Sequence, residues 1–346
     1  MELKITTLIE NMPDDEEILA CEHGLSLYIE FDGRKILFDT GQTGEFVSNA
    51  QKLGKSLAEV DYFIISHGHY DHSGGVMRLV KELKDAVSVG TEEGIGSKPW
   101  LMEKPADAGS GTVTPISMYV GAEFFHKKYK HLSDGTYRYN GNPFREADLP
   151  AERLALHKIT EDVTYLEENI MIFKNFKRVT SFEKPNPKFI VERFDRLGDN
   201  PGISMERAET SVGGFTELPD VSETSLANGK KEISVYEQDD FRDEIALGLR
   251  TTKGLVLVVG CSHVGIVNIS QTVMERTGEQ VYSVLGGTHL MEADEERLDK
   301  TMISLRECGL EQIAVSHCTG DAGMEKVAQE FGSNFVKNNT GHVYVV

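Results

Sequence analysis

Short apolar runs separated by polar turns mark the first part of this chain. Residues 25–31 and 35–38 have the length and the β-branched or aromatic content of strands, and Asp32-Gly33 between them is a strong hairpin signal. Residues 60–65 form another short apolar run, which is typical of a buried strand. Residues 46–52 and 76–83 have helical spacing, and residues 87–89 are the next candidate strand. The succession of strand, loop, helix and strand predicts a layered α/β fold.

Regular patterning returns near the carboxyl terminus. Residues 244–249 and 255–259 predict a hairpin joined through Thr252-Lys253-Gly254. Further strands are expected at 281–285, 312–315 and 342–346, and helices at 266–275, at 295–308 and in a segment ending near 331.

The centre of the chain, residues 94–239, is less regular. It is rich in glycine, proline and asparagine turns, which predict loops and short strands. A stretch of this length is rarely structureless in a compact protein, so we interpret it as an insertion or cap that contributes substrate contacts. The expected organisation is a single domain over residues 1–346 with this region inside it.

Four of the predicted strands end in a short loop that carries histidine. These loops follow Ile65, Val259, Leu285 and Val315. Ligands of open α/β sheets gather at the carboxyl ends of the strands, so the four loops are expected to converge on one place.

The first of these loops concentrates metal-binding chemistry. Its sequence HGHYDH, residues 67–72, holds three imidazoles and a carboxylate, although only 11 of the 346 residues are histidine. Nitrogen and oxygen donors of this kind suit zinc, iron or manganese. The alternative is a polar loop with chance histidines, which this local density makes the weaker interpretation.

The same residues carry a family resemblance. HGHYDHSGG matches the HxHxDH signature of the metallo-β-lactamase superfamily, and FDTG at 38–41 looks like the first motif of that superfamily. GCSHVGIVN at 260–268, GGTHL at 286–290 and SHCTG at 316–320 resemble its dihydropteroate-synthase-like subgroup, the 7,8-dihydropterin-6-methyl-4-(β-D-ribofuranosyl)-aminobenzene-5′-phosphate synthases. The resemblance covers roughly residues 1–95 and 240–346.

This resemblance implies an αββα sandwich with a mono- or dinuclear metal site at the sheet edge. Typical dinuclear members place a bridging aspartate after a later strand, where this chain has Gly260-Cys261-Ser262-His263. Either His263 substitutes as a ligand, or the site holds one tight and one weak metal ion.

The candidate site residues fall into two sets. The expected metal ligands are His67, His69, Asp71, His72, His263 and His289, with Asp71 also the candidate catalytic group and His289 an alternative substrate contact. The expected supporting or substrate-binding residues are Asp39, His317, Cys318 and Thr319. A carboxylate such as that of Asp39 can fix the free N–H of a ligating histidine, and the alternative for Asp39 is an ordinary turn residue at a strand end. The helix start after Cys318-Thr319 can hold a phosphate.

An open metal position predicts hydrolysis. A bound metal ion lowers the pKa of water from 15.7 to roughly 7 and so supplies hydroxide, which Asp71 would orient unless it binds a second ion. The favoured function is therefore a metal-dependent hydrolase acting on a small molecule, pterin-like or phosphorylated, with one or two divalent ions, zinc first and iron or manganese as alternatives. An iron-dependent oxidoreductase on the same fold and a non-catalytic metal-binding or sensor protein are the competing functions.

Composition and net charge limit the classes of binding partner that are expected. The net charge of −20 disfavours nucleic-acid binding, and the basic patch at residues 126–130 is interpreted as a solvated charge run in preference to a phosphate contact. There is no apolar run of about 18 residues and no signal-peptide pattern, so a cytoplasmic location is expected.

The four cysteines form no CxxC pair and are interpreted as buried thiols. The remaining histidines with no context are expected to be structural or exposed: His23, His131, His157 and His342.

Overall fold

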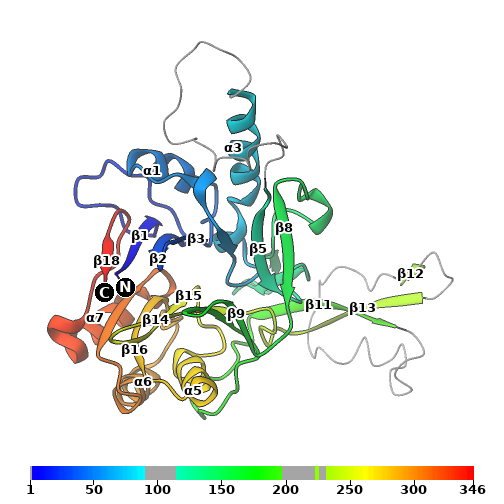
Figure 1. The fold of residues 1–346 in the computed structure, drawn as a ribbon. Helices are drawn as coiled ribbons and strands as arrows, with labels where there is room; N and C mark the ends of the chain where they lie inside the picture. Colours follow the sequence, from blue (N-terminus) through cyan, green and yellow to red (C-terminus); the bar gives the residue numbers. More distant parts are fainter. Residues whose placement is uncertain (1, 90–113, 197–222, 226–230) are drawn as a thin grey trace.

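Two β-sheets packed face to face form the centre of the computed structural model, which describes residues 2–89, 114–196, 223–225 and 231–346 (Figure 1). The first sheet has the strand order β18-β1-β2-β3-β4-β5-β8 and the second β17-β16-β15-β14-β10-β9. The strands of the first sheet are β1 (Leu3–Ile9), β2 (Ser26–Phe31), β3 (Arg34–Phe38), β4 (Tyr62–Ile64), β5 (Ile116–Gly121), β8 (Leu154–Ile159) and β18 (Val343–Val345). Those of the second are β9 (Val163–Glu167), β10 (Ile170–Phe173), β14 (Ala246–Thr251), β15 (Gly254–Val259), β16 (Val281–Gly287) and β17 (Gln312–Ser316).

Helices cover the outer face of each sheet (Figure 1). The helices are α1 (Phe46–Lys52), α2 (Tyr70–Ser73), α3 (Val76–Val89), α5 (Ile266–Thr277), α6 (Glu295–Glu307) and α7 (Gly320–Phe331). Buried residues of α1 and α3 pack on the first sheet, and those of α5, α6 and α7 pack on the second. A separate apolar core, which includes Ile29, Ile172, Leu247 and Val258, fills the space between the sheets. These four layers confirm the predicted αββα sandwich.

The predicted hairpin and the predicted helices are confirmed, because their sequence patterns depend on residues that are close together along the chain. Asp32 and Gly33 both adopt positive φ, 51° and 74°, and join β2 to β3 in a tight turn, as the Asp-Gly pair predicts. The strand predicted at 87–89 is wrong, because these residues form the end of α3. No glycine or proline separates them from the preceding helical residues, and an apolar run of three residues cannot by itself distinguish a strand from a helix end.

Among the described residues of the region 94–239, strands β5, β8, β9 and β10 lie in the two main sheets, and the other strands form a third sheet with the order β12-β13-β11-β6-β7. Its strands are β6 (Lys128–His131), β7 (Tyr137–Tyr139), β11 (Phe189–Arg196), β12 (Glu223–Ser225) and β13 (Lys231–Gln238). The long β11–β13 ribbon extends away from the sandwich (Figure 1). The sequence pattern could not distinguish the short strands of the sandwich from this ribbon, because the same types of turn residue bound both.

Parallel pairing brings the histidine loops together. Strands β15, β16 and β17 pair in parallel, and in the other sheet β4 is parallel to both β3 and β5. The loops that follow β4, β15, β16 and β17 therefore leave the two sheets along one edge, as the sequence predicts. Within the described residues, no helix is long and apolar enough to cross a membrane.

Truncation of the core between the sheets should destabilise the protein strongly. Leu247 of β14 is fully buried there, and we expect Leu247→Ala to lower the free energy of unfolding by about 2–5 kcal/mol through lost burial and a residual cavity. Urea unfolding followed by circular dichroism measures this loss. The matched control is Ile303→Ala on α6, where the side chain is 58% exposed and a change of less than about 0.5 kcal/mol is expected. Equal losses in the two variants would contradict the placement of the core.

Candidate metal centre

The HGHYDH segment begins three residues after the end of β4 and passes from an extended loop into a helical turn. His69 has extended backbone angles and directly precedes α2, whose first turn contains Asp71 and His72. His67 and His69 therefore project from the loop, whereas Asp71 and His72 project from the helical turn. A Cβ on Gly68 would lie 2.4 Å from the carbonyl oxygen of Phe124, so only glycine fits between the two loop histidines.

Three imidazoles form the first group of candidate ligands, which we call the three-histidine group: His67, His69 and His263. All three are buried, and one ring nitrogen of each lies within 4.8 Å of those of the others. Nε2 of His67 is 3.1 Å from Nδ1 of His69. Three imidazoles with no carboxylate between them are the donor set of a catalytic zinc site that leaves a position for water.

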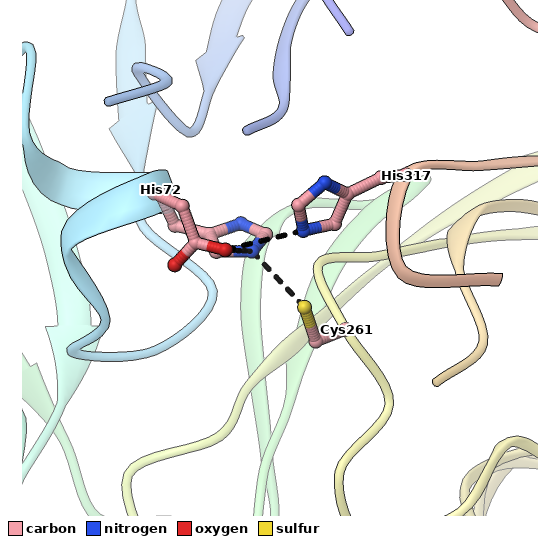
Figure 2. Close-up of side chains that lie close together, drawn as sticks. His72, Cys261 and His317 are labelled. Atoms are coloured by element: carbon pink, nitrogen blue, oxygen red, sulfur yellow. Dashed lines mark hydrogen bonds and ion pairs between the residues drawn. The ribbon is translucent and has the colours of Figure 1, made fainter. Parts of the chain in front are cut away.

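The second group, which we call the four-residue group, lies beside the first: Asp71, His72, Cys261 and His317. Figure 2 shows His72, Cys261 and His317 converging from three separate segments of the chain. Nε2 of His72 is 3.1 Å from Sγ of Cys261, and Nε2 of His317 is 3.4 Å from Oδ2 of Asp71. The rings of His67 and His72 are 4.4 Å apart between centroids, so the two groups are neighbours.

In His72 and in His317, a hydrogen bond to one ring nitrogen directs the other ring nitrogen toward the four-residue group. Nδ1 of His72 is 2.6 Å from Oδ2 of Asp39, and Nδ1 of His317 is 2.9 Å from Oδ1 of Asn11. Asp39 also accepts hydrogen bonds from the backbone N–H and the hydroxyl of Ser66. Such contacts fix the tautomer and the orientation of a ligating imidazole.

Burial and charge set the protonation states of the site. Burial holds the pKa of His67, His69 and His263 well below its usual value, so these rings are neutral, the form that binds a metal. Burial also opposes the charged form of His72, but the carboxylates of Asp39 and Asp71 outweigh it and raise the pKa of His72 to about 9. Burial raises the pKa of the Cys261 thiol.

Buried carboxylates hold the backbone of the histidine loops. Asp243 accepts a hydrogen bond from the backbone N–H of Gly68 at 2.7 Å, and Glu10 accepts one from the backbone N–H of His317. Glu244 accepts from the backbone N–H groups of His263 and Val264 at 2.7 and 2.8 Å, and burial raises its pKa to about 7. The loops are thus fixed by their amides, which leaves the imidazoles free for a ligand.

The donors fit a divalent cation. Buried polar atoms in proteins almost always have hydrogen-bond partners, yet Nε2 of His69 and both ring nitrogens of His263 have none among the described residues. Buried imidazole nitrogens without hydrogen-bond partners are costly unless a cation accepts their lone pairs. The residues present therefore match the requirements of a metal centre.

The remaining predicted site residues lie around these groups. His289 belongs to neither group, although its ring is 4.5 Å from that of His263 between centroids. The thiol of Cys318 contacts the backbone oxygen of Cys261 and the backbone N–H of His289. The hydroxyl of Thr319 contacts the hydroxyl and the backbone N–H of Thr288. Cys318 and Thr319 thus tie the loops after β16 and β17 together.

Sequence reasoning missed three contributors. Cys261, interpreted as a buried thiol, is part of the four-residue group. His23, expected to be structural or exposed, is 45% exposed but places Nε2 3.2 Å from Oδ2 of Asp71. Lys128, interpreted as part of a solvated charge run, is buried and paired with Asp239 and Asp243. The position of Cys261 after a buried strand, beside a histidine, was the one local signal; the other two contacts join distant segments.

One aromatic side chain from the third sheet and one from the segment that follows β13 close the other side of the three-histidine group. The ring of Phe241 stacks on that of His263 with centroids 3.9 Å apart and planes 6° apart. Phe189, the first residue of β11, lies 5.3 Å from the ring of His69. The added sheet thus supplies an apolar wall to the site.

Comparisons with known proteins agree with this fold. Residues 20–159 match the model of the metallo-beta-lactamase superfamily. The chain is 27% identical to a 7,8-dihydropterin-6-methyl-4-(beta-D-ribofuranosyl)-aminobenzene-5'-phosphate synthase of Methanocaldococcus jannaschii, with 99% of this chain and 96% of that protein covered. A metal-dependent hydrolase of Staphylococcus aureus is 36% identical over 74 residues, 20% of this chain and 30% of that protein.

A solved structure supports the same fold. The crystal structure of a metal-dependent hydrolase of the beta-lactamase superfamily superposes with a TM-score of 0.68 at 24% identity, and the match covers 99% of this chain and 98% of that one. The family model, the whole-length relative and the shared fold agree with each other. Residues 20–159 of this chain therefore match the metallo-β-lactamase superfamily, and the chain as a whole has the fold of that superfamily.

Proposed function

We propose that this protein is a metal-dependent hydrolase of a small, phosphorylated or pterin-like molecule. The observation that carries the proposal is the pair of adjacent buried donor groups at the carboxyl ends of the strands. These donors would hold a divalent cation, whose Lewis acidity would supply activated water and a polarised carbonyl or phosphoryl oxygen, as ester, lactone, amide or phosphodiester cleavage requires. We favour zinc because imidazole and thiol donors predominate over carboxylates.

The residues of the chain divide the remaining work. Asp39 orients His72, and Asn11 orients His317. Asp71 remains a carboxylate, since His72, His23 and His317 outweigh the effect of its burial and hold its pKa well below the usual value. His23 contacts Asp71 and is partly exposed to solvent, so we assign it the exchange of protons between the site and water.

A cavity of about 420 Å³ next to the site has the size of a small-molecule pocket. Its lining includes His317, Lys337 and Gly320 at the start of α7, together with the acidic residues Glu10 and Asp321. A helix start and a lysine favour an anionic substituent such as a phosphate. With a net charge of −20, the protein as a whole favours a small anion that enters this local site over a nucleic acid.

A second candidate is group transfer at the same centre, with an amine in place of water as the nucleophile. The observation that favours it is the whole-length likeness to the methanogen synthase, whose name specifies a pterin joined to an aminobenzene phosphate. Incubation of the metal-loaded protein with pterin esters, with and without an arylamine, separates the two: hydrolysis proceeds without the amine, and transfer requires it.

Removal of two ligands should abolish both metal binding and turnover. We expect the native protein to purify with about one or two equivalents of metal. His67→Ala/His69→Ala should lose at least one of them and at least about 100-fold in activity on a panel of ester, lactone and phosphodiester substrates. Elemental analysis and product assays measure the two effects. His342→Ala, which removes a histidine that belongs to neither group, is the control and should retain the metal. A native protein that takes up no metal from excess salts would refute the proposed function.

Weakening the support of His72 should lower metal affinity without unfolding the chain. Asp39→Asn replaces one accepting oxygen by a donor, so the contact to His72 or to Ser66 is lost. We expect a 10- to 100-fold, order-of-magnitude decrease in affinity for zinc, as for other residues that orient a ligand. Competition with a chromophoric chelator measures it. Asp32→Asn is matched, since Asp32 also has a positive φ, 51° against 60° for Asp39, but lies in the β2–β3 turn. Equal affinities in all three proteins would exclude a role for Asp39.

A further inference from the structure

The segment that joins β13 to β14, which we call the connecting segment (residues 239–245), holds both loops of the three-histidine group. Its Asp243 accepts a hydrogen bond from the backbone N–H of Gly68 at 2.7 Å. Its Glu244 accepts one from the backbone N–H of His263 at the same distance. The loop after β4 and the loop after β15 are therefore fixed to one short stretch of chain.

The backbone of the connecting segment is strained at Phe241. Its φ is 57°, in the left-handed region that a bulky residue rarely adopts. Such a conformation persists only where the surrounding structure enforces it, and it is concentrated at functional sites. Here it places the aromatic ring on the imidazole of His263, with the centroids 3.9 Å apart. The backbone N–H of Phe241 is held in turn by Oδ1 of Asp239 at 2.8 Å.

A buried lysine of the third sheet holds the connecting segment at two points. Nζ of Lys128, in β6, lies 2.5 Å from Oδ1 of Asp243 and 3.1 Å from Oδ2 of Asp239. All three side chains are buried, and among the described residues no second cation forms an ion pair with either carboxylate. Loss of the lysine would leave two buried carboxylates without their compensating charge, which is strongly unfavourable.

A positive charge is an unexpected neighbour for a site that holds a cation. The ammonium of Lys128 lies 5.1 Å from the centre of the Phe241 ring, and the same ring stacks on His263. Like charges repel at such separations, so the charge of Lys128 by itself opposes metal binding. A favourable effect on metal binding must therefore come from the groups that Lys128 holds in place.

We propose that Lys128 is a positioning residue of the metal centre, which holds Asp243 against the amide of Gly68 and the connecting segment against His263. The inference rests on the proposed function, in that the three-histidine group is taken to bind the metal ion. Lys128 acts through its two carboxylate partners, as residues that orient a ligand from behind commonly do. The third sheet then fixes the geometry of the donors in addition to covering them.

The sign of the change in zinc affinity tests this role. Lys128→Met removes the charge and keeps an unbranched side chain of similar length. Because positioning outweighs repulsion, we expect a decrease in affinity of about 10- to 100-fold, measured by competition with a chromophoric chelator. Removal of a repelling charge alone would raise the affinity, so an unchanged or raised affinity would overturn the inference.

Arg193→Met is the matched control. Arg193 of β11 is a partly buried cation of the same sheet, and its ion pairs are with Glu123, Glu237 and Asp240. We expect this variant to lose stability in urea, as Lys128→Met does, but to bind zinc as the wild-type protein does. An equal decrease in zinc affinity in the two variants would assign the effect to general loss of stability and would contradict the inference.

Amide hydrogen exchange of the metal-free protein gives a second readout, which requires neither metal nor turnover. The amide of Gly68 is protected by its hydrogen bond to Asp243. Its exchange should be at least about tenfold faster in Lys128→Met than in the wild-type protein, and unchanged in Arg193→Met. Mass spectrometry of peptides that span residues 66–72 measures the rate. Equal protection in Lys128→Met and the wild-type protein would show that Lys128 does not hold Asp243 in place.

A double-mutant cycle tests whether Lys128 acts through Asp243. Asp243→Asn should itself lower the zinc affinity, and Lys128→Met should then cause little further loss, because the two side chains act as one unit. Additive losses would mean that Lys128 acts by another route and would overturn the inference. Should Lys128→Met fail to fold, Asp243→Asn decides the matter: wild-type zinc affinity and wild-type exchange at Gly68 in this variant would be the contrary result.

The proposed function and the role of Lys128 can fail separately. A protein that hydrolyses the substrate panel, but whose Lys128→Met variant binds zinc as the wild type does, would refute the role of Lys128 alone. A protein whose Lys128→Met variant loses both zinc affinity and protection at Gly68, but which hydrolyses no substrate, would refute the proposed function and leave the role of Lys128 in place.

Discussion

Asp39 joins the two structural units on which the metal centre depends. Its carboxylate is fully buried and accepts hydrogen bonds from the backbone and the hydroxyl of Ser66, and it contacts Nδ1 of His72 at 2.6 Å. Ser66 lies in the loop two residues after the end of β4, whereas His72 lies in α2, so one carboxylate fixes the loop and the helical turn relative to each other. A buried charge of this kind is tolerated only when its oxygens are hydrogen-bonded, and here the partners are parts of the site itself.

The same principle recurs at the other histidine loops. Asp243, Glu244 and Glu10 each accept hydrogen bonds from backbone amides next to a candidate ligand. Lys128 compensates Asp243, and its pairing with Asp239 ties the third sheet to the same network. Part of the acidic character of this chain therefore serves to position the donors. The amides are satisfied by carboxylates, and the imidazole nitrogens remain available for a cation.

The third sheet changes the surroundings of the centre without supplying its donors. Phe189 and Phe241 come from strands or loops added between the two halves of the sandwich, and both pack against rings of the three-histidine group. Their contact excludes water from one side of His69 and His263. The cavity beside His317 lies on the side of α7 instead, so the aromatic wall and this cavity occupy different flanks of the site.

The sequence by itself determined most of the fold. The β2–β3 turn follows from Asp32-Gly33, the parallel strands follow from their apolar runs, and the four histidine loops could be placed on one edge because parallel strands end together. The density of histidine at residues 67–72 also predicted a metal centre. These features depend on neighbours within a few positions along the chain, where backbone preference and hydrophobic period act directly.

Only the tertiary structure decided how the donors are divided. Cys261 and His72 are 189 positions apart, and His317 joins Asp71 from the last strand–helix connection, so no local pattern could assign them to one group. The carboxylates that hold the loops, and the contact of His23 with Asp71, likewise arise from the packing of distant segments. The same limit explains why strands β5, β8, β9 and β10 could not be separated from the third sheet. Sequence specifies which chemical groups are present at the strand ends, but coordination depends on distances of a few ångströms between groups that the chain brings together only when both sheets have packed.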